Sequence, residues 1–287
     1  MAFSGKAIVA KLLYRHGVDA LSAVALRMLL AGPLFLLMAW WSGRGQAALT
    51  RRDWAQVALL GFMGYYLSSL LDFAGLQYIS ASLERLILYV YPTIVALIIA
   101  VRRRSAISRR QALAFAASYA GVLLAFGQEA SGGLQAPAAQ VAWGSALVLA
   151  SAVSYAVYLV LAGDAVARLG ALRVTGLASS FACALCLVHF CLLRPSSAWY
   201  DFAPEVWQLS VLNATLCTVL PIWMVMRAIE SIGSSDTAQL ALIGPVTTLL
   251  LAVWLLQEPF TLTLLAGTAL VLFGVAILAG QKQRAAP

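Results

Sequence analysis

Charged side chains are scarce in this sequence. Only 10% of its 287 residues are Asp, Glu, Lys or Arg, whereas 62% are hydrophobic and the mean hydropathy is +0.89. About 25% of the residues of a typical soluble domain are charged. The chain therefore has too few polar side chains to cover a soluble domain of its length, and its composition indicates an integral membrane protein.

Motifs of catalysis and of nucleotide binding are missing as well. The sequence has no G-x-S-x-G, no H-E-x-x-H and no Gly-rich phosphate loop, so we expect neither an enzyme nor a protein that hydrolyses ATP. Cys183 and Cys186 have C-x2-C spacing, but they stand in an apolar run with only His189 and Cys191 nearby. A zinc site needs four convergent ligands. We therefore expect no metal and no cofactor.

Long apolar runs are abundant, and ten of them are spaced along the chain. A transmembrane helix needs about 20 apolar residues. The runs lie near residues 2–14, 20–41, 54–73, 80–101, 111–126, 141–161, 174–193, 206–226, 235–256 and 262–280. They predict an all-α integral membrane protein with ten transmembrane helices.

The first run is too short to cross a membrane. Its residues, at about 1.5 Å each, reach about 20 Å, whereas the hydrocarbon core is about 30 Å thick. The interpretation is a truncated first helix, with about a dozen upstream residues belonging to the native N-terminus.

The chain matches itself at an offset of 153 positions. Residues that share this register include Arg15 with Arg168, Gly17 with Gly170, Trp54 with Trp207 and Pro92 with Pro245. The offset predicts a first repeat over 1–127 (helices 1–5), a linker over 128–140, a second repeat over 141–280 (helices 6–10) and a tail over 281–287. One linker of the first repeat holds five arginines, whereas its equivalent holds Gln257 and Glu258. This difference predicts that the repeats are inverted in the membrane.

Basic residues also predict the orientation. Thirteen Lys and Arg residues fall in one set of loops and termini, and only Arg15 and Arg194 fall in the other set. Because cytoplasmic loops are the basic ones, both termini are expected in the cytoplasm. The net charge of +8 then faces anionic lipid rather than nucleic acid, and we expect no nucleic-acid partner.

Helix 4 carries the densest set of polar residues. Tyr78, Ser82, Arg85 and Tyr89 recur at spacings of four and three, which places them on one helix face, and Glu84 adjoins Arg85. One interpretation is a stripe that lines the substrate pathway, with Arg85 attracting a carboxylate. The alternative is that the two charges lie near the outer surface, neutralise each other and only anchor the helix.

Other polar and aromatic residues inside the runs are candidates for the pathway, because charged or polar groups at membrane depth normally face a cavity or a partner. They are Lys6, Lys11, Tyr65, Ser69, Tyr155, Tyr158, Thr218, Trp223 and Gln239. Helix bends are expected at Pro92, Pro221 and Pro245, since proline removes a backbone donor.

Three short segments resemble a known family. Phe3 to Lys11 is similar to a Trp-Gly-Ser-Asn-x4-Lys pattern, Ala25-Leu26-Arg27 to a Leu-Arg-Phe segment, and Leu256 to Pro259 to a Leu-Gly-Glu turn. These patterns belong to EamA-type members of the drug/metabolite transporter superfamily. The sequence departs from them at Lys6, where Asn is usual, and at Arg104-Ser105, where Gly-Glu is expected.

The resemblance implies a secondary transporter with ten helices in a bacterial inner membrane. Such a carrier works by alternating access around a central cavity formed mainly by helices 1, 3, 4, 6, 8 and 9. Members move small metabolites such as amino acids, often outward. A pathway enclosed in one doubled chain needs no second subunit, so a functional monomer is expected in the lipid bilayer.

Two other functions are alternatives to a carrier. An integral membrane enzyme acting on lipid intermediates should show paired acids at an interface, but Glu129, Asp201 and Glu205 are scattered along the sequence. A non-transporting sensor or assembly subunit usually carries a soluble domain, and none of the loops is long enough to form one. A carrier remains the expectation.

Overall fold

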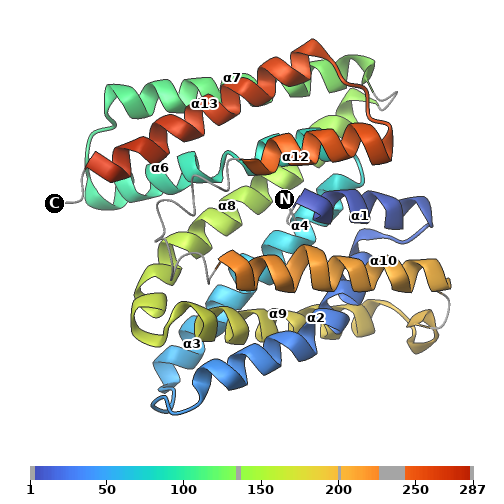
Figure 1. The fold of residues 1–287 in the computed structure, drawn as a ribbon, viewed down its shortest axis with the longest axis vertical. Coiled ribbons are helices and arrows are strands. Elements are labelled where there is room, and N and C mark those ends of the chain that lie inside the picture. The colour runs from blue at the N-terminus through green and yellow to red at the C-terminus, as the bar shows by residue number, and fades with distance from the viewer. Residues whose placement is uncertain (1–3, 134–136, 200–201, 226–242, 285–287) are drawn as a thin grey trace.

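The computed structural model describes residues 4–133, 137–199, 202–225 and 243–284, and all regular elements in these ranges are helical (Figure 1). The first half contains α1 (Gly5–Arg15), α2 (Ala20–Gly43), α3 (Arg51–Leu60), the π-helical η2 (Gly61–Leu67), α4 (Ser68–Leu76), α5 (Ala81–Leu88), α6 (Tyr91–Arg103), α7 (Arg109–Gln128) and η3 (Glu129–Gly133). The second half contains α8 (Ala138–Leu169), α9 (Ala171–Leu193), η4 (Ser196–Trp199), α10 (Pro204–Ala214), η5 (Thr215–Val219), α12 (Ile243–Leu251), η6 (Ala252–Leu256) and α13 (Leu262–Arg284).

Several consecutive elements form longer helices that coincide with the apolar runs of the sequence. Within the described ranges, seven helices are long and apolar enough to cross a membrane: 20–43, 51–76, 81–103, 109–131, 138–169, 171–193 and 204–225. Two shorter apolar helices cover 244–256 and 262–278, and α1 is the tenth. The prediction of an all-helical membrane protein with ten helices is confirmed.

Two antiparallel helix pairs flank the bundle. Helix α7 lies beside α13, and α2 lies beside α9 (Figure 1); these two pairs make the most extensive contacts between described elements. Each pair consists of helices from corresponding places in the two halves of the chain. Helix α8 crosses the space between the pairs and packs on α4, α5 and α6.

The backbone repeats the offset seen in the sequence. Among the described residues, the left-handed non-glycine residues are Arg104 (φ 50°) and Gln257 (φ 59°), which lie 153 positions apart. Gly17 and Gly170, with φ of 77° and 81°, have the same separation. The π-helical segments η2 and η5 also overlap under this offset. The repeat identified from Trp, Pro and Gly in the sequence is therefore also present in the backbone conformation.

The close contact between α7 and α13 also follows the 153-residue offset. A Cβ atom at Gly121 would lie 2.5 Å from the carbonyl oxygen of Gly267, and a Cβ atom at Gly274 would lie 2.5 Å from that of Ala114. Gly121 corresponds to Gly274 in the repeat, and Ala114 to Gly267, so the two contacts are one contact made twice. Small residues at both places let the helices approach.

The span from Ala81 to Arg103 is broken in the middle. Helix α5 ends at Leu88 and α6 begins at Tyr91, with Pro92 in its first turn. Because proline has no N–H group, it is favoured in the first turn of a helix, where that N–H group would have no intrahelical partner. Helix α5 is therefore a short separate unit with Ser80 as its N-cap.

The loops gather at two ends of the bundle. The loops α2–α3 and α6–α7, and the junction α8–α9, lie at the left in Figure 1, and this arginine-rich end includes Arg44, Arg51, Arg52 and residues 102–110. The loops α1–α2, α4–α5 and α12–α13 lie at the other end, which we call the opposite end. Helix α1 has 11 residues, so Gly5 lies inside the bundle beside Cys217 of η5.

Candidate functional site

Four buried charged side chains and the partly buried Lys6 lie together in the apolar bundle. We call them the central charge cluster: Lys6 on α1, Arg27 on α2, Asp72 on α4, and Glu84 and Arg85 on α5. Lys6 Nζ is 2.5 Å from Asp72 Oδ2. A charge at the centre of a membrane helix costs about 2.5–3.5 kcal/mol, so five of them indicate a polar interior that the sequence maintains against this cost.

Arg27 is buried on α2 against the ring of Phe73. It is 3% exposed, and neither Nε nor Nη2 has a hydrogen-bond partner in the described part of the chain. Its guanidinium stacks on the ring of Phe73 at 4.6 Å, which is within cation–π distance. Two buried donors without acceptors normally cost about 1–3 kcal/mol each, so this guanidinium is available to an anionic ligand.

Glu84 and Arg85 lie in the interior rather than at the surface. Glu84 is 0% exposed and Arg85 is 8% exposed. Arg85 Nε is 3.9 Å from Glu84 Oε2, beyond hydrogen-bonding distance. Over the described residues, neither oxygen of Glu84 accepts a hydrogen bond. Both side chains are therefore buried within the protein, and they face each other as an ion pair.

Four tyrosines form a second polar and aromatic group, the tyrosine cluster. Tyr65 of η2 and Tyr158 of α8 have hydroxyl oxygens 3.1 Å apart. Tyr155 stacks on Tyr158 with ring centroids 5.6 Å apart, and Tyr91 meets Tyr155 edge to face at 5.3 Å. The structure thus brings together three aromatic candidates and adds Tyr91.

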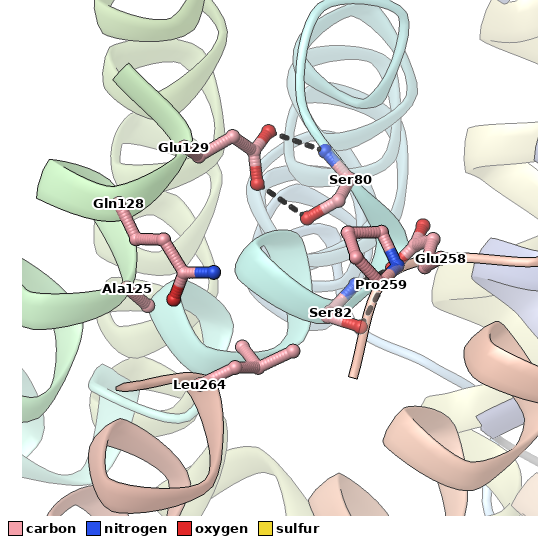
Figure 2. Close-up of a pocket in the computed structure, with 8 residues that line it drawn as sticks. All are labelled: Ser80, Ser82, Ala125, Gln128, Glu129, Glu258, Pro259 and Leu264. Carbon is pink, nitrogen blue, oxygen red and sulfur yellow. Dashed lines mark hydrogen bonds between the residues drawn. The ribbon is translucent and has the colours of Figure 1, made fainter. Parts of the chain in front are cut away.

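Two carboxylates hold the N-terminus of α5 at the opposite end (Figure 2). Glu129 accepts hydrogen bonds from the Ser80 backbone N–H at 2.7 Å and from the Ser80 hydroxyl at 2.5 Å. Glu258 accepts from the N–H groups of Ala81 and Ser82 at 2.8 and 3.2 Å, and from the Ser82 hydroxyl at 2.6 Å. We call this arrangement the α5 clamp. Negative charge is favourable here because the helix dipole is positive at its N-terminus.

A cavity of about 330 Å³, the vestibule, opens beside the clamp. It is lined by Lys11, Tyr14, Arg15, Gln77, Ser80, Leu256 and Glu258. Arg15 Nη2 donates to the carbonyl oxygen of Leu256 at 2.8 Å, which ties α1 to the α12–α13 turn. A smaller cavity of about 30 Å³ lies on the other side of Ser80 and Glu258, against Gln128 and Leu264. Ser80 and Glu258 of the clamp thus line both cavities.

The arginine-rich end has no matching carboxylate in the corresponding turn. The residue equivalent to Glu258 in the repeat is Ser105, which follows the left-handed Arg104. The partners equivalent to Ala81 and Ser82 fall in 226–242, outside the described residues. The two ends of the bundle therefore differ chemically at a place where their backbones agree.

The remaining candidates are dispersed. Ser69 is half-buried on α4. Tyr78 is 37% exposed in the turn before α5, so it does not belong to a face of that helix. Tyr89 lies at the α5–α6 break, and its hydroxyl group lies against Gly244. Thr218 donates to the carbonyl oxygen of Asn213, Trp223 is 46% exposed, and Gln239 lies outside the described residues. Pro221 follows η5 and Pro245 stands in the first turn of α12.

Sequence reasoning missed four important residues. Arg27 and Glu258 stood in the motifs of the resemblance but were not assigned to the site. Asp72 pairs with Lys6, which is 66 positions away, and no sequence pattern indicates such a pair. Glu129 was regarded as isolated, whereas it binds Ser80.

Fold and site together define a class: an all-helical, multi-pass membrane protein whose two halves repeat and enclose buried charges. The model of the EamA-like transporter family matches residues 1–127 and 142–280, so the chain belongs to the EamA-like transporter family. The resemblance seen in the sequence is confirmed, and the protein is a membrane transporter, not an enzyme.

Relatives of similar length are also described as transporters. The uncharacterized transporter YcbK of Bacillus subtilis (strain 168) is 28% identical, with 99% of this chain and 90% of that protein covered. The uncharacterized transporter YetK of the same organism is 23% identical, with 99% and 86% covered. A solved crystal structure with 21% identity superposes with a TM-score of 0.64 over 99% of this chain and 94% of that chain, which shows a common fold.

Proposed function

We propose that this transporter exports a small metabolite bearing both a carboxylate and an ammonium group, such as an amino acid, by alternating access through the centre of the bundle. The observation that carries the proposal is the central charge cluster, which places cations and acids within one buried site. A zwitterion carries one negative and one positive group, which complement the cations and the acids of the site. Each end of the ligand would replace water with a charge-assisted hydrogen bond.

The positive part of the site fits a carboxylate. Arg27 has two nitrogen atoms without acceptors among the described residues, and Arg85 lies on α5. Arginine presents a planar fork of donors that matches a carboxylate. The negative part fits an ammonium group, because Glu84 has two oxygens that accept no hydrogen bond from the described residues.

Helix α5 has the properties of a moving gate. It is eight residues long, is held by the clamp at one end and is separated from α6 by the Tyr89–Val90 break at the other. Release of Glu129 and Glu258 would free α5 to turn about this break and open the vestibule to the charge cluster. The antiparallel pairs α2–α9 and α7–α13 support an inverted repeat, and in such transporters one half rocks against the other.

We place the transporter in a bacterial inner membrane as a functional monomer with both termini in the cytoplasm. Basic residues concentrate at the arginine-rich end, and cytoplasmic loops are the basic ones. Single cysteines in a variant without the four native ones test this orientation in intact cells. A cysteine at Gly132 should react with an impermeant maleimide, and one at Arg103 should react only after lysis; the reverse pattern contradicts the orientation.

Counterflow into proteoliposomes tests the substrate. Liposomes containing the full-length protein are preloaded with one of a panel of amino acids and related metabolites, and uptake of the labelled compound is measured. At least one zwitterionic compound should exchange, and exchange should depend on the protein. If no zwitterion on the panel exchanges while another class of metabolite does, the proposed substrate class is wrong.

Arg85 variants then test the site with the compound that exchanges best. Arg85→Lys keeps the charge but loses the two-donor fork, and Arg85→Ala loses both. Loss of one charge-assisted hydrogen bond of about 1.5–3 kcal/mol corresponds to a roughly 10- to 150-fold weaker apparent affinity. Arg102→Ala, at the exposed arginine-rich end, is the matched control. Wild-type affinity in both Arg85 variants would remove Arg85 from the site.

A further inference from the structure

The vestibule contains a lysine that has no partner in the described part of the chain. Lys11 of α1 lines this cavity and is half-buried. It makes no hydrogen bond and no ion pair with any described residue. Its ammonium group offers three donors, and donors that are taken partly out of water need acceptors. Lys11 is therefore available to an anion that enters the cavity from solution.

The charges around the vestibule also favour an anion. Arg15 is a second cation in its wall, and the hydrogen bond from Arg15 Nη2 to the carbonyl oxygen of Leu256 holds the guanidinium in place. Glu258 is the only acid among the described residues that line the cavity, and its oxygens already accept three hydrogen bonds from the start of α5. Two cations beside one occupied carboxylate attract negative charge.

The vestibule runs from the clamp to the surface of the protein. Glu258 and Ser80 are buried, whereas Arg15 and Gln77 are exposed. The volume of about 330 Å³ lies at the small end of the range of about 300–1,000 Å³ that is usual for small-molecule pockets. The cavity is therefore large enough for one small metabolite.

Helix α1 connects the vestibule to the central charge cluster. Lys6 and Lys11 both lie on this helix, and the rise between them is about 7.5 Å. Helix α1 also contacts α5, α12 and η6, which carry the clamp and the turn that follows it. A carboxylate that leaves the cluster on this side therefore reaches Lys11 after a short step.

We propose that the vestibule is a second, outer binding site, in which Lys11 binds the carboxylate of the transported solute between the central charge cluster and the medium. The proposal rests on the proposed function for the identity of the solute, but the carboxylate site itself does not depend on it. Lys11 donates charge-assisted hydrogen bonds to the carboxylate, and Arg15 adds its positive charge. A flexible ammonium group orients a carboxylate less rigidly than an arginine fork does, which suits a site that must release its ligand.

The first experiment needs no transported solute. A cysteine replaces Gln77 at the exposed rim in a variant without the four native cysteines, and its reaction rates with an anionic and a cationic methanethiosulfonate reagent are compared. The anionic reagent should be favoured, and Lys11→Gln should lower the ratio of the two rates several-fold. Arg102→Gln, at the arginine-rich end, is the matched control and should leave the ratio unchanged. An equal ratio with and without Lys11 would overturn the anion site.

Acetate serves as the carboxylate probe in the second experiment. In vesicles of phosphatidylcholine alone, acetate should slow the anionic reagent at Gln77→Cys more than chloride of the same ionic strength does, and Lys11→Gln should remove this difference. Slowing that appears only when the vesicles contain phosphatidylglycerol would assign the site to a lipid phosphate and overturn the proposal. Equal effects of acetate and chloride would overturn it too.

The third experiment uses the compound found by counterflow and distinguishes an outer site from the central one. Lys11→Gln should raise the apparent KM roughly 10-fold in membrane vesicles whose vestibule faces the medium, and it should leave KM unchanged in vesicles whose arginine-rich end faces the medium. An equal rise in both orientations would place Lys11 in the central site and contradict the proposal. If no zwitterion exchanges, the proposed function fails, and the reagent and acetate experiments still decide the carboxylate site.

Folding is controlled with two further variants. Lys11→Arg keeps the positive charge and should keep the preference for the anionic reagent. Should Lys11→Gln give no folded protein, Lys11→Met removes the charge but keeps an unbranched side chain that packs in apolar surroundings, and it should lose the preference. A wild-type preference in Lys11→Met contradicts a role for Lys11.

Discussion

The α5 clamp and the central charge cluster both contain buried carboxyl groups, but the hydrogen bonding of these groups differs. In the clamp, Glu258 accepts three hydrogen bonds and Glu129 accepts two, all from the N-terminus of α5. In the central charge cluster, Glu84 accepts none from the described residues although it is 0% exposed. Less than two helical turns separate Ser80 from Glu84 on the chain.

This contrast separates carboxylates that stabilise the fold from carboxylates that can bind a ligand. A carboxylate whose acceptors are filled by the fold stabilises the fold, because removing it leaves buried donors unpaired. A carboxylate whose acceptors stay empty destabilises the fold, and it is retained for a ligand or a proton that fills them. Both kinds of carboxylate lie on or against the same short helix, α5.

Loss of Glu258 should give the largest effect on stability. Glu258→Ala leaves three donors at the start of α5 without acceptors, which should cost about 3 kcal/mol and lower the thermal midpoint of the solubilised protein by several degrees. Glu205→Ala, at an exposed position, should leave the midpoint unchanged. A wild-type midpoint for Glu258→Ala would show that the clamp does not hold α5.

Loss of Glu129 should have a smaller effect in the same direction. Glu129→Ala removes two hydrogen bonds, both to Ser80, and should cost about 2 kcal/mol. The same thermal measurement ranks the two variants. An effect larger than that of Glu258→Ala would reverse the assignment of the main clamp residue.

Neutralising Glu84 should leave stability unchanged or raise it slightly. Glu84→Gln removes a negative charge that accepts no hydrogen bond from the described residues, so no hydrogen bond of this part of the fold is lost. We expect a change within about 1 kcal/mol, the net size of one hydrogen bond. A strong fall in the thermal midpoint would place Glu84 with the clamp residues rather than with the ligand site.

The smallest effect concerns Asp19, an acid outside the spans that caps α2. Burial opposes its negative charge, but hydrogen bonds from Ser22 and Arg194 outweigh this and hold the pKa of Asp19 below its ordinary value. Its stabilisation is therefore present at neutral pH and is lost as the pH falls through the lowered value, below about pH 4.

Asp19→Asn shows the size of this contribution. The pair with Arg194 is half-exposed, so the variant should lose less than about 1 kcal/mol at pH 7 and nothing at low pH. Thermal midpoints of wild type and variant at both pH values measure the difference. A gap that grows on acidification would contradict the assigned sign.

Local features of the fold could be predicted from the sequence. Hydropathy located the ten helices, because a span must be apolar over its length. The 153-residue offset located paired backbone features, as Gly17 and Gly170 or Arg104 and Gln257 show. The helical stripe on helix 4 was predicted less well: α5 starts after Tyr78 and ends before Tyr89, because Ser80 caps the helix and Pro92 starts the next one.

The sequence by itself determined the class of the protein, its helices and its doubled plan, since each of these depends on composition and on spacing within a segment. Only the tertiary structure decided which charges meet. Lys6 reaches Asp72 across 66 residues and Glu258 reaches Ser82 across 176, and both contacts exist because helices from different parts of the chain pack side by side. A charged residue in a membrane span signals that a partner is needed, but which partner it finds depends on helix packing, and packing is set by many small contacts spread over the whole chain.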